Sequence, residues 1–104
     1  MKLDNSPEIK RLEKKLGVEL LWVFVLSMLK KEESHAYTLR KKIESEFGFL
    51  PGNVTAYVVL YKLQSRGFVS SQKEGNKVVY SITVLGEKLL DTAKKLLVQK
   101  SKSI

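Results

Sequence analysis

The chain has 104 residues, 43% of them hydrophobic and 29% charged, which is the composition of one globular domain. Nineteen Lys and Arg against eleven Asp and Glu give a net charge of +8, which favours polyanionic partners such as nucleic acid or an anionic membrane surface. The absence of cysteine excludes disulfides and cysteine-ligated zinc, and a single histidine, His35, argues against a histidine-based metal site or a Ser-His-Asp triad.

The first helix is expected to follow a frayed segment, residues 1–5. The Ser-Pro-Glu sequence at residues 6–8 is a helix start, because Ser can cap, Pro fits the first helical position and Glu suits the positive helix end. Apolar residues share one face of this helix: Ile9, Leu12 and Leu16. Gly17 is expected to end the helix or to bend it.

The next segment, residues 18–30, is apolar nearly all round and is expected to form the central, buried helix. Its apolar run from Leu20 to Leu29 is too short to span a bilayer, which takes roughly 20 apolar residues. No small-residue cleavage site follows the run, so neither a membrane segment nor a signal peptide is expected.

A third helix is expected at residues 36–47. Ser34 is a good cap for it, and Gly48 is placed to end it. Four apolar residues repeat along it at helical spacing: Ala36, Leu39, Ile43 and Phe47. The following residues, 49–53, contain Pro and Gly and are expected to form a turn.

A fourth helix is expected at residues 54–66, capped by Asn53 and ended by Gly67. Three of its apolar residues share one narrow face that should point to the core: Ala56, Leu60 and Leu63. The side chains that then point outward are Val54, Thr55, Val58, Tyr61, Lys62 and Ser65.

Two strands, residues 68–73 and 77–83, are predicted by alternation and are joined by a hairpin signal at Glu74-Gly75-Asn76. The strand side chains expected to point inward are Phe68, Val78, Tyr80 and Ile82.

Thr83 is expected to cap a last helix at residues 84–100, and residues 101–104 are expected to be a disordered basic tail. The helix carries a broad apolar stripe: Leu85, Leu89, Leu90, Ala93, Leu96 and Leu97. This stripe is too wide for one small core to cover, which favours contact with a second subunit.

The order of these elements predicts a mainly α fold with a small β hairpin (α+β), a winged helix-turn-helix. Residues 6–83 would form the DNA-binding domain and residues 84–100 the dimerisation helix. In helix-turn-helix proteins the second helix enters the major groove and the first braces it. The hairpin can then act as a wing on the same duplex, with basic residues near its tip placed for phosphate or minor-groove contact.

The outward face of the fourth helix is unusual for a solvated surface because Val54, Val58 and Tyr61 lie on it together. Apolar side chains can meet thymine methyl groups, and Thr55 can hydrogen-bond a base edge or a phosphate. Alternatively, Val58 and Tyr61 pack against the wing or against a partner subunit. On the preceding helix, Tyr37 either reaches a phosphate or packs in the core.

The chain also resembles the PadR family of transcriptional regulators over about residues 18–90. The resemblance is carried by an apolar helix followed by His35-Ala36-Tyr37, then Thr55-Ala56-Tyr57 with Leu60, Leu63 and Gly67, then Tyr80-Ser81-Ile82-Thr83 and Gly86-Glu87. No single motif is specific, but their order and spacing together are. Ala36 stands where Gly is usual, and Ala56 replaces a larger apolar residue.

The resemblance implies a homodimeric repressor of the short subgroup, with one C-terminal helix. Such a protein dimerises through its N- and C-terminal helices and binds a roughly palindromic operator in double-stranded DNA. Candidate DNA-binding residues are Tyr37, Arg40, Lys41, Asn53, Val54, Thr55, Tyr57, Val58, Tyr61, Lys62, Lys73, Asn76 and Lys77. Candidate dimerisation residues are Ile9, Leu12, Leu16, Leu85, Leu89, Leu90, Ala93, Leu96 and Leu97.

Family members often respond to a phenolic or drug-like ligand near the dimer interface, and Trp22 is the candidate residue for a small aromatic effector. The alternative for Trp22 is a core tryptophan with no ligand. No cofactor, metal or membrane is expected, and a cytoplasmic, nucleoid-associated location follows from DNA binding.

Other functions fit parts of the pattern. The +8 charge permits a nonspecific architectural DNA-binding protein, although such a protein needs only basic residues on its recognition face. A winged-helix module that binds proteins is a third reading, and charge reversal at Lys73 and Lys77 would separate it from the other two. An enzyme is not expected, because no nucleophile–base pair or metal constellation is recognisable.

Overall fold

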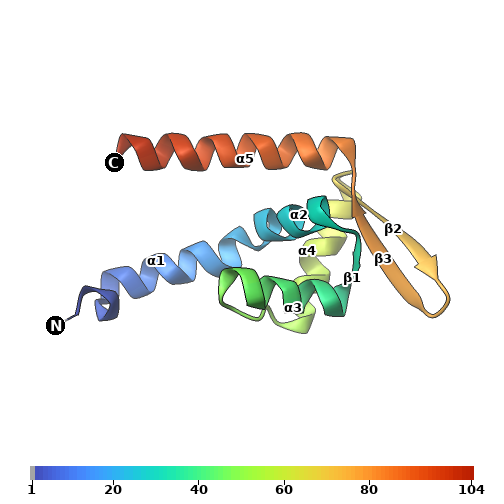
Figure 1. Cartoon of the computed structure of the whole chain (residues 1–104), viewed down its shortest axis with the longest axis horizontal. Coiled ribbons are helices and arrows are strands. Elements are labelled where there is room, and N and C mark those ends of the chain that lie inside the picture. The colour runs from blue at the N-terminus through green and yellow to red at the C-terminus, as the bar shows by residue number, and fades with distance from the viewer. Residues whose placement is uncertain (1) are drawn as a thin grey trace.

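Five α-helices and a small antiparallel sheet make up the computed structural model, which describes residues 2–104 and measures 53 Å along its longest axis (Figure 1). The element order is η1 (Leu3–Asn5), α1 (Pro7–Gly17), η2 (Val18–Leu20), α2 (Leu21–Lys31), β1 (Ser34–His35), α3 (Ala36–Phe47), α4 (Asn53–Ser65), β2 (Val69–Glu74), β3 (Lys77–Ile82) and α5 (Val84–Ser103). This is the winged helix-turn-helix that the sequence predicts.

Helix α1 begins where the Ser-Pro-Glu sequence places it. The Ile9 N–H donates to Ser6 Oγ at 3.1 Å, and Pro7 occupies the first helical position. The expectation of a frayed start is wrong for Leu3–Asn5, which form the single 3-10 turn η1; Met1 lies outside the described residues. Gly17 ends α1, which is one of the two expected outcomes, and the helical segments η2 and α2 follow it directly.

Helix α2 lies at the centre of the core, as its apolar composition predicts. Its side chains Leu21, Val25 and Leu26 have at most 1% of their surface exposed. Helices α3, α4 and α5 and strand β3 all pack against it. Within residues 2–104, no helix has the length and apolar character needed to cross a membrane, and no three acidic or histidine side chains meet in a way that could hold a metal ion.

Strand β1 was not predicted from the sequence. Ser34 was expected to cap α3, but it pairs with Tyr80 of β3, and His35 occupies the position before the helix. Since β3 also pairs with β2, the sheet order is β1-β3-β2 and β3 is the middle strand. The Ser34 expectation is wrong because a pairing with a strand more than 40 residues away determines the local backbone.

The hairpin turn is confirmed: Glu74 pairs with Lys77, and Gly75 has the positive φ of 61° that this two-residue turn requires. The assignment of Val78 as an inward residue is wrong. Val78 shares a face with Tyr80, but it lies nearer the tip of a hairpin that projects beyond the helices, and it is 39% exposed (Figure 1). Val79, on the opposite face, is buried instead and pairs with His35 of β1.

Helix α5 is capped by Thr83 as predicted, because Thr83 Oγ1 accepts a hydrogen bond from the Gly86 N–H at 3.0 Å. The helix does not end at residue 100. It continues to Ser103, so the expected disordered tail is wrong for residues 101–103, where the sequence holds no Gly or Pro that would stop a helix.

Candidate nucleic-acid interface

The turn between α3 and α4 is fixed by backbone and side-chain contacts. Gly48 adopts a left-handed φ of 81°, and its N–H donates to the Glu44 carbonyl at 3.0 Å. Pro51 is fully buried, and its carbonyl accepts a 2.9 Å hydrogen bond from Arg40 Nε. Arg40 therefore sets the direction of α4, and only its two terminal nitrogens remain for the DNA backbone contact predicted from the sequence.

Helix α4 begins one residue earlier than expected. Asn53 is its first helical residue, so the prediction that Asn53 caps the helix is wrong. Gly52 occupies the cap position with an extended backbone, and its carbonyl accepts the first helical hydrogen bond from Ala56. The Asn53 side chain makes no capping bond and lies exposed at the start of the helix.

The inward and outward faces of α4 agree with the helical spacing. Ala56, Leu60 and Leu63 are buried. On the opposite side, Val54 is 78% exposed and Tyr61 73% exposed. The other exposed members of the predicted face are Val58, Lys62 and Ser65, while Thr55 is only partly exposed. No other part of the described chain packs closely enough to cover Val54 or Tyr61, so the wing does not mask this face.

The two flanks of α4 face different neighbours, which the sequence did not reveal. On one flank, Gln64 Nε2 donates to Ser71 Oγ of β2 at 2.8 Å and joins the helix to the wing. On the same side, burial and the nearby Tyr57 raise the pKa of the Tyr80 phenol, so its hydroxyl stays protonated at neutral pH. On the other flank, Lys62 and Arg66 line a cavity described below.

Three residues of α3 were predicted to contact DNA. Tyr37 is 66% exposed, so the alternative that it packs in the core is wrong. Lys41 lies with its amino nitrogen 5.9 Å from the centre of the Tyr37 ring, within the range of a cation–π contact. Lys41 also lies 3.9 Å from a Glu44 carboxylate oxygen, and both of its contacts are solvent-exposed and therefore weak.

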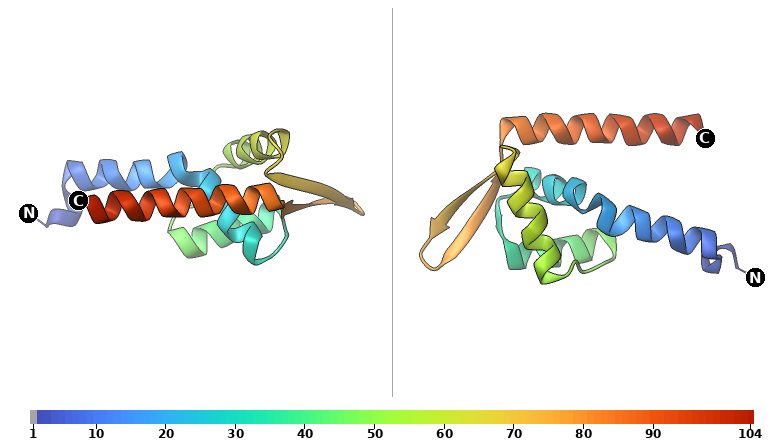
Figure 2. Two further views of the ribbon diagram at one scale, coloured as in Figure 1. Left: turned by 90° about the horizontal axis from the view of Figure 1, so that it is seen from above. Right: turned by 180° about the vertical axis from the view of Figure 1, so that it is seen from behind.

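The wing places its candidate residues at its free end. Lys73, Asn76 and Lys77 are exposed, and they surround the Gly75 turn. Figures 1 and 2 show the wing tip and the N-terminal end of α4 on one side of the molecule, with α5 on the opposite side. Helix face and wing tip can therefore meet one surface at the same time.

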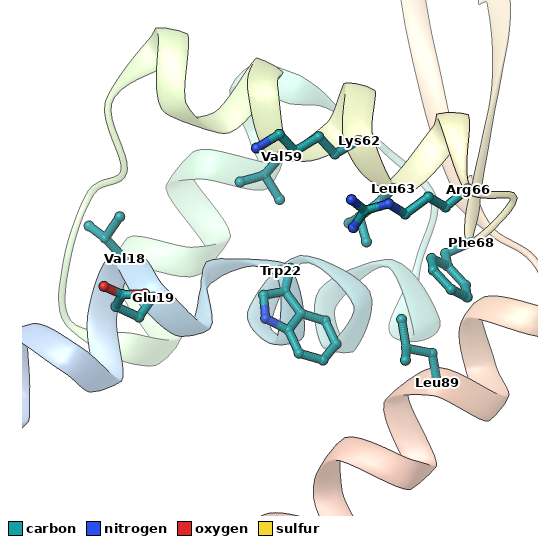
Figure 3. Close-up of a pocket in the computed structure, with 9 residues that line it drawn as sticks. All are labelled: Val18, Glu19, Trp22, Val59, Lys62, Leu63, Arg66, Phe68 and Leu89. Atoms are coloured by element: carbon teal, nitrogen blue, oxygen red, sulfur yellow. The ribbon is translucent and has the colours of Figure 1, made fainter.

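A cavity of about 500 Å³ opens between α2, α4, the base of the wing and α5 (Figure 3). Trp22, Phe68 and Leu89 supply apolar walls. Lys62 of α4 and Arg66 just after it add positive charge, and Glu19 of η2 adds a negative one. Trp22 is only partly buried, so it is neither a fully enclosed core residue nor a surface one. The other lining residues of this cavity were not predicted, because nothing in the sequence places Phe68 or Leu89 beside Trp22.

The apolar residues of the terminal helices divide into two groups. Leu12 and Leu16 of α1 are about half exposed, as are Leu85, Leu96 and Leu97 of α5, while Ile9 and Leu89 are partly buried. The prediction that Leu90 and Ala93 contact a partner is wrong, because both are buried in the chain's own core. The stripe of α5 is thus covered from within at Leu90 and Ala93 and bare at Leu96 and Leu97, and Leu85 at its start is half exposed.

Comparison with known proteins identifies relatives of this chain. The model of the transcriptional regulator PadR-like family matches residues 25–92. A candidate transcriptional regulator from Thermoplasma acidophilum has 28% identity, a TM-score of 0.74, and coverage of 85% of this chain and 89% of its own. No curated protein matches the sequence.

Two more distant structures share the fold. A transcriptional regulator from Clostridium thermocellum has 20% identity and a TM-score of 0.76, covering 94% of this chain and 92% of its own. A PadR family transcription regulator from Clostridium difficile has 19% identity and a TM-score of 0.75, covering 81% and 93%.

Proposed function

The chain belongs to the transcriptional regulator PadR-like family and is thus a DNA-binding transcriptional regulator, and we propose that it represses transcription by binding a palindromic operator as a homodimer. The observation that carries this proposal is the exposed face of α4, with Val54 and Tyr61 largely bare, beside a basic wing tip on the same side of the molecule (Figure 2). Recognition helix α4 enters the major groove, and the wing contacts the backbone or the minor groove. The protein acts with the nucleoid in the cytoplasm.

Dimerisation is supported by the bare apolar residues of α1 and α5. Leu90 and Ala93 lie on one face of α5, and Leu97 continues that face at helical spacing where no core covers it. Helix α1 and the second half of α5 extend from the same end of the molecule (Figure 1). A second copy that covers both would place two copies of α4 for two half-sites about 34 Å apart.

Selection of bound sequences from a random DNA pool tests the proposal. We expect an inverted repeat whose half-site centres are separated by roughly one helical turn. With about six phosphate contacts, the logarithm of the binding constant should fall against the logarithm of salt concentration with a slope near −5. Equal affinity for every sequence would instead favour the nonspecific architectural role.

Neutralising the wing tip should weaken binding without changing sequence preference. In a Lys73→Gln, Lys77→Gln variant, each lost phosphate contact should reduce the salt slope by about 1, because fewer counterions are released. A Lys94→Gln, Lys95→Gln variant removes the same charge from α5, on the side away from the wing tip, and should keep the slope. Filter binding at several salt concentrations measures the salt slope of each variant. Equal slopes in the two variants would show that the wing tip does not contact DNA.

The cavity beside Trp22 is proposed as the site of a small aromatic effector. Its aromatic walls suit a ring. Lys62 belongs to the recognition helix and Arg66 follows it directly, so an occupant would contact the element proposed to read DNA. Trp22 is the only tryptophan, so its fluorescence reports occupancy directly. Saturable quenching by phenol or benzoate would support the site, and quenching that rises linearly with concentration would count against it.

A further inference from the structure

We propose that α4 selects thymine at the base pairs beneath its centre by packing Val54 and Val58 against thymine 5-methyl groups. This inference rests on the proposed function, because it requires that α4 lies in the major groove. It goes further by assigning the base that the helix reads and the chemical group by which it reads it.

The centre of the exposed face is a narrow stripe. Val54, Val58, Tyr61 and Ser65 follow one another at spacings of four, three and four residues, which places them on a single line along the helix. Val54 and Val58 lie toward the N-terminal end, which is the end that contacts base edges in helix-turn-helix proteins. The stripe therefore presents two branched hydrocarbon side chains at the position where bases are read.

The side chains that usually read guanine and adenine are directed elsewhere. Arg or Lys pairs with guanine, and Asn or Gln pairs with adenine, through two hydrogen bonds. In α4, Gln64 is hydrogen-bonded to Ser71 of the wing, and Lys62 lines the cavity beside Trp22. Arg66, just after the helix, lines the same cavity.

The remaining polar groups lie beside the stripe or away from its base-reading end. Thr55 is partly buried and lies about a quarter turn from Val54, and the Tyr61 hydroxyl lies toward the C-terminal half of the helix. The Ser65 hydroxyl donates its proton to the Lys62 carbonyl at 2.9 Å, so it is left only as an acceptor. Asn53 is exposed at the first residue of the helix, but it lies about a quarter turn from Val54 and so stands beside the stripe. An Asn53 contact would fall at the edge of the half-site, not under its centre.

Thymine is the base whose major-groove edge matches this chemistry. It alone carries a methyl group there, whereas cytosine presents an amino donor and the purines present polar atoms that a valine would leave unpaired. Burying one group of this size is worth about a fourfold change in affinity. Two valines over two thymines in each half-site would contribute roughly a fifteenfold preference per half-site.

Methyl deletion in the DNA tests the inference directly. Starting from the operator obtained by selection, each thymine is replaced by deoxyuridine, which keeps base pairing and removes only the methyl group. We expect about fourfold weaker binding at each thymine under a valine, and roughly fifteenfold when both half-sites are changed together. Replacing such a T·A pair by 5-methylcytosine·G should cost less than replacing it by C·G, because the methyl group is retained.

Two protein variants assign the effect to the stripe. Val58→Ala should bind operators with thymine or deoxyuridine under residue 58 with nearly equal affinity, because that contact is already lost, while the difference at the thymine under Val54 should remain. Val84→Ala, at an exposed valine at the start of α5, should keep the fourfold difference. Both valines are exposed, so neither change disturbs the core.

The outcomes separate this inference from the proposed function. If a palindromic consensus is selected but deoxyuridine binds as tightly as thymine at every position, methyl reading is wrong and operator binding stands. A consensus with only G·C pairs under the helix would also overturn the inference. If selection returns no consensus, the proposed function itself has failed.

Discussion

A Leu97→Asp variant is expected to be a monomer and to bind the operator at least a hundredfold more weakly than the parent protein. Leu97 is 41% exposed on the same face of α5 that the core covers at Leu90 and Ala93. A carboxylate there is tolerated by a monomer but costs too much when it is buried without a partner between two subunits. Losing the second half-site removes the gain from linked binding, which is on the order of 10² to 10⁴.

Sedimentation and operator binding together measure this effect. Val84→Asp introduces the same charge at an exposed apolar residue of the same helix, but next to the wing, and it should leave mass and affinity unchanged. Leu12→Asp in α1 should behave like Leu97→Asp if both helices form the interface. A Leu97→Asp protein that sediments as a dimer and binds normally would show that the bare half of α5 is not the contact surface.

A Gly86→Ala variant is expected to lose about 3 kcal/mol of stability. A Cβ at this position would collide with the Phe68 carbonyl oxygen and would lie 2.8 Å from Ile82 Cγ1. The Phe68 carbonyl cannot easily move aside, because it accepts the Thr83 N–H at 3.1 Å. Helix propensity alone favours Ala over Gly by about 1 kcal/mol. The collision therefore predicts a loss of stability where propensity predicts a gain.

Urea unfolding of the parent protein and the Gly86→Ala variant decides between a loss and a gain of stability, with Gly52→Ala as the matched control. Gly52 has a φ of −60°, which any residue adopts, and an added Cβ would meet only Thr55 Oγ1 at an ordinary 3.7 Å. This variant should change stability by less than about 1 kcal/mol, because the entropy gained on replacing Gly offsets the preference for Gly over Ala at a helix cap. If Gly86→Ala is as stable as the parent protein, α5 does not approach the base of the wing as closely as described.

Local signals in the sequence predict the boundaries of several elements. Ser6 and Thr83 cap the helices they were expected to cap, and Gly48 and Gly75 have the positive φ that their positions demand. In each case the determining contact lies within four residues, so it can be recognised without the fold. The same holds for the inward and outward faces of α4, which depend only on helical spacing.

Features that depend on distant partners could not be predicted in this way. Strand β1 exists because Ser34 and His35 meet β3, and Val79 is buried where they cover it. An apolar stripe on a helix shows that the face is buried but not which element buries it. Leu90 and Ala93 were therefore assigned to a second subunit, although α2 and its neighbours already bury them. The flanks of α4 are a similar case, because the Gln64 contact requires the wing to be in place.

The pairing of β1 with β3 has a consequence for how such a protein can be regulated. It ties the start of α3 to the middle strand of the wing, while Thr83 Oγ1 donates to the Gly67 carbonyl at 2.6 Å and ties the end of α4 to the start of α5. Helix α4 and the wing are thereby joined into one unit. Under the proposed function, an inducing signal would act on the separation of two such units in the dimer, and DNA would be released when that separation no longer equals the pitch of the duplex.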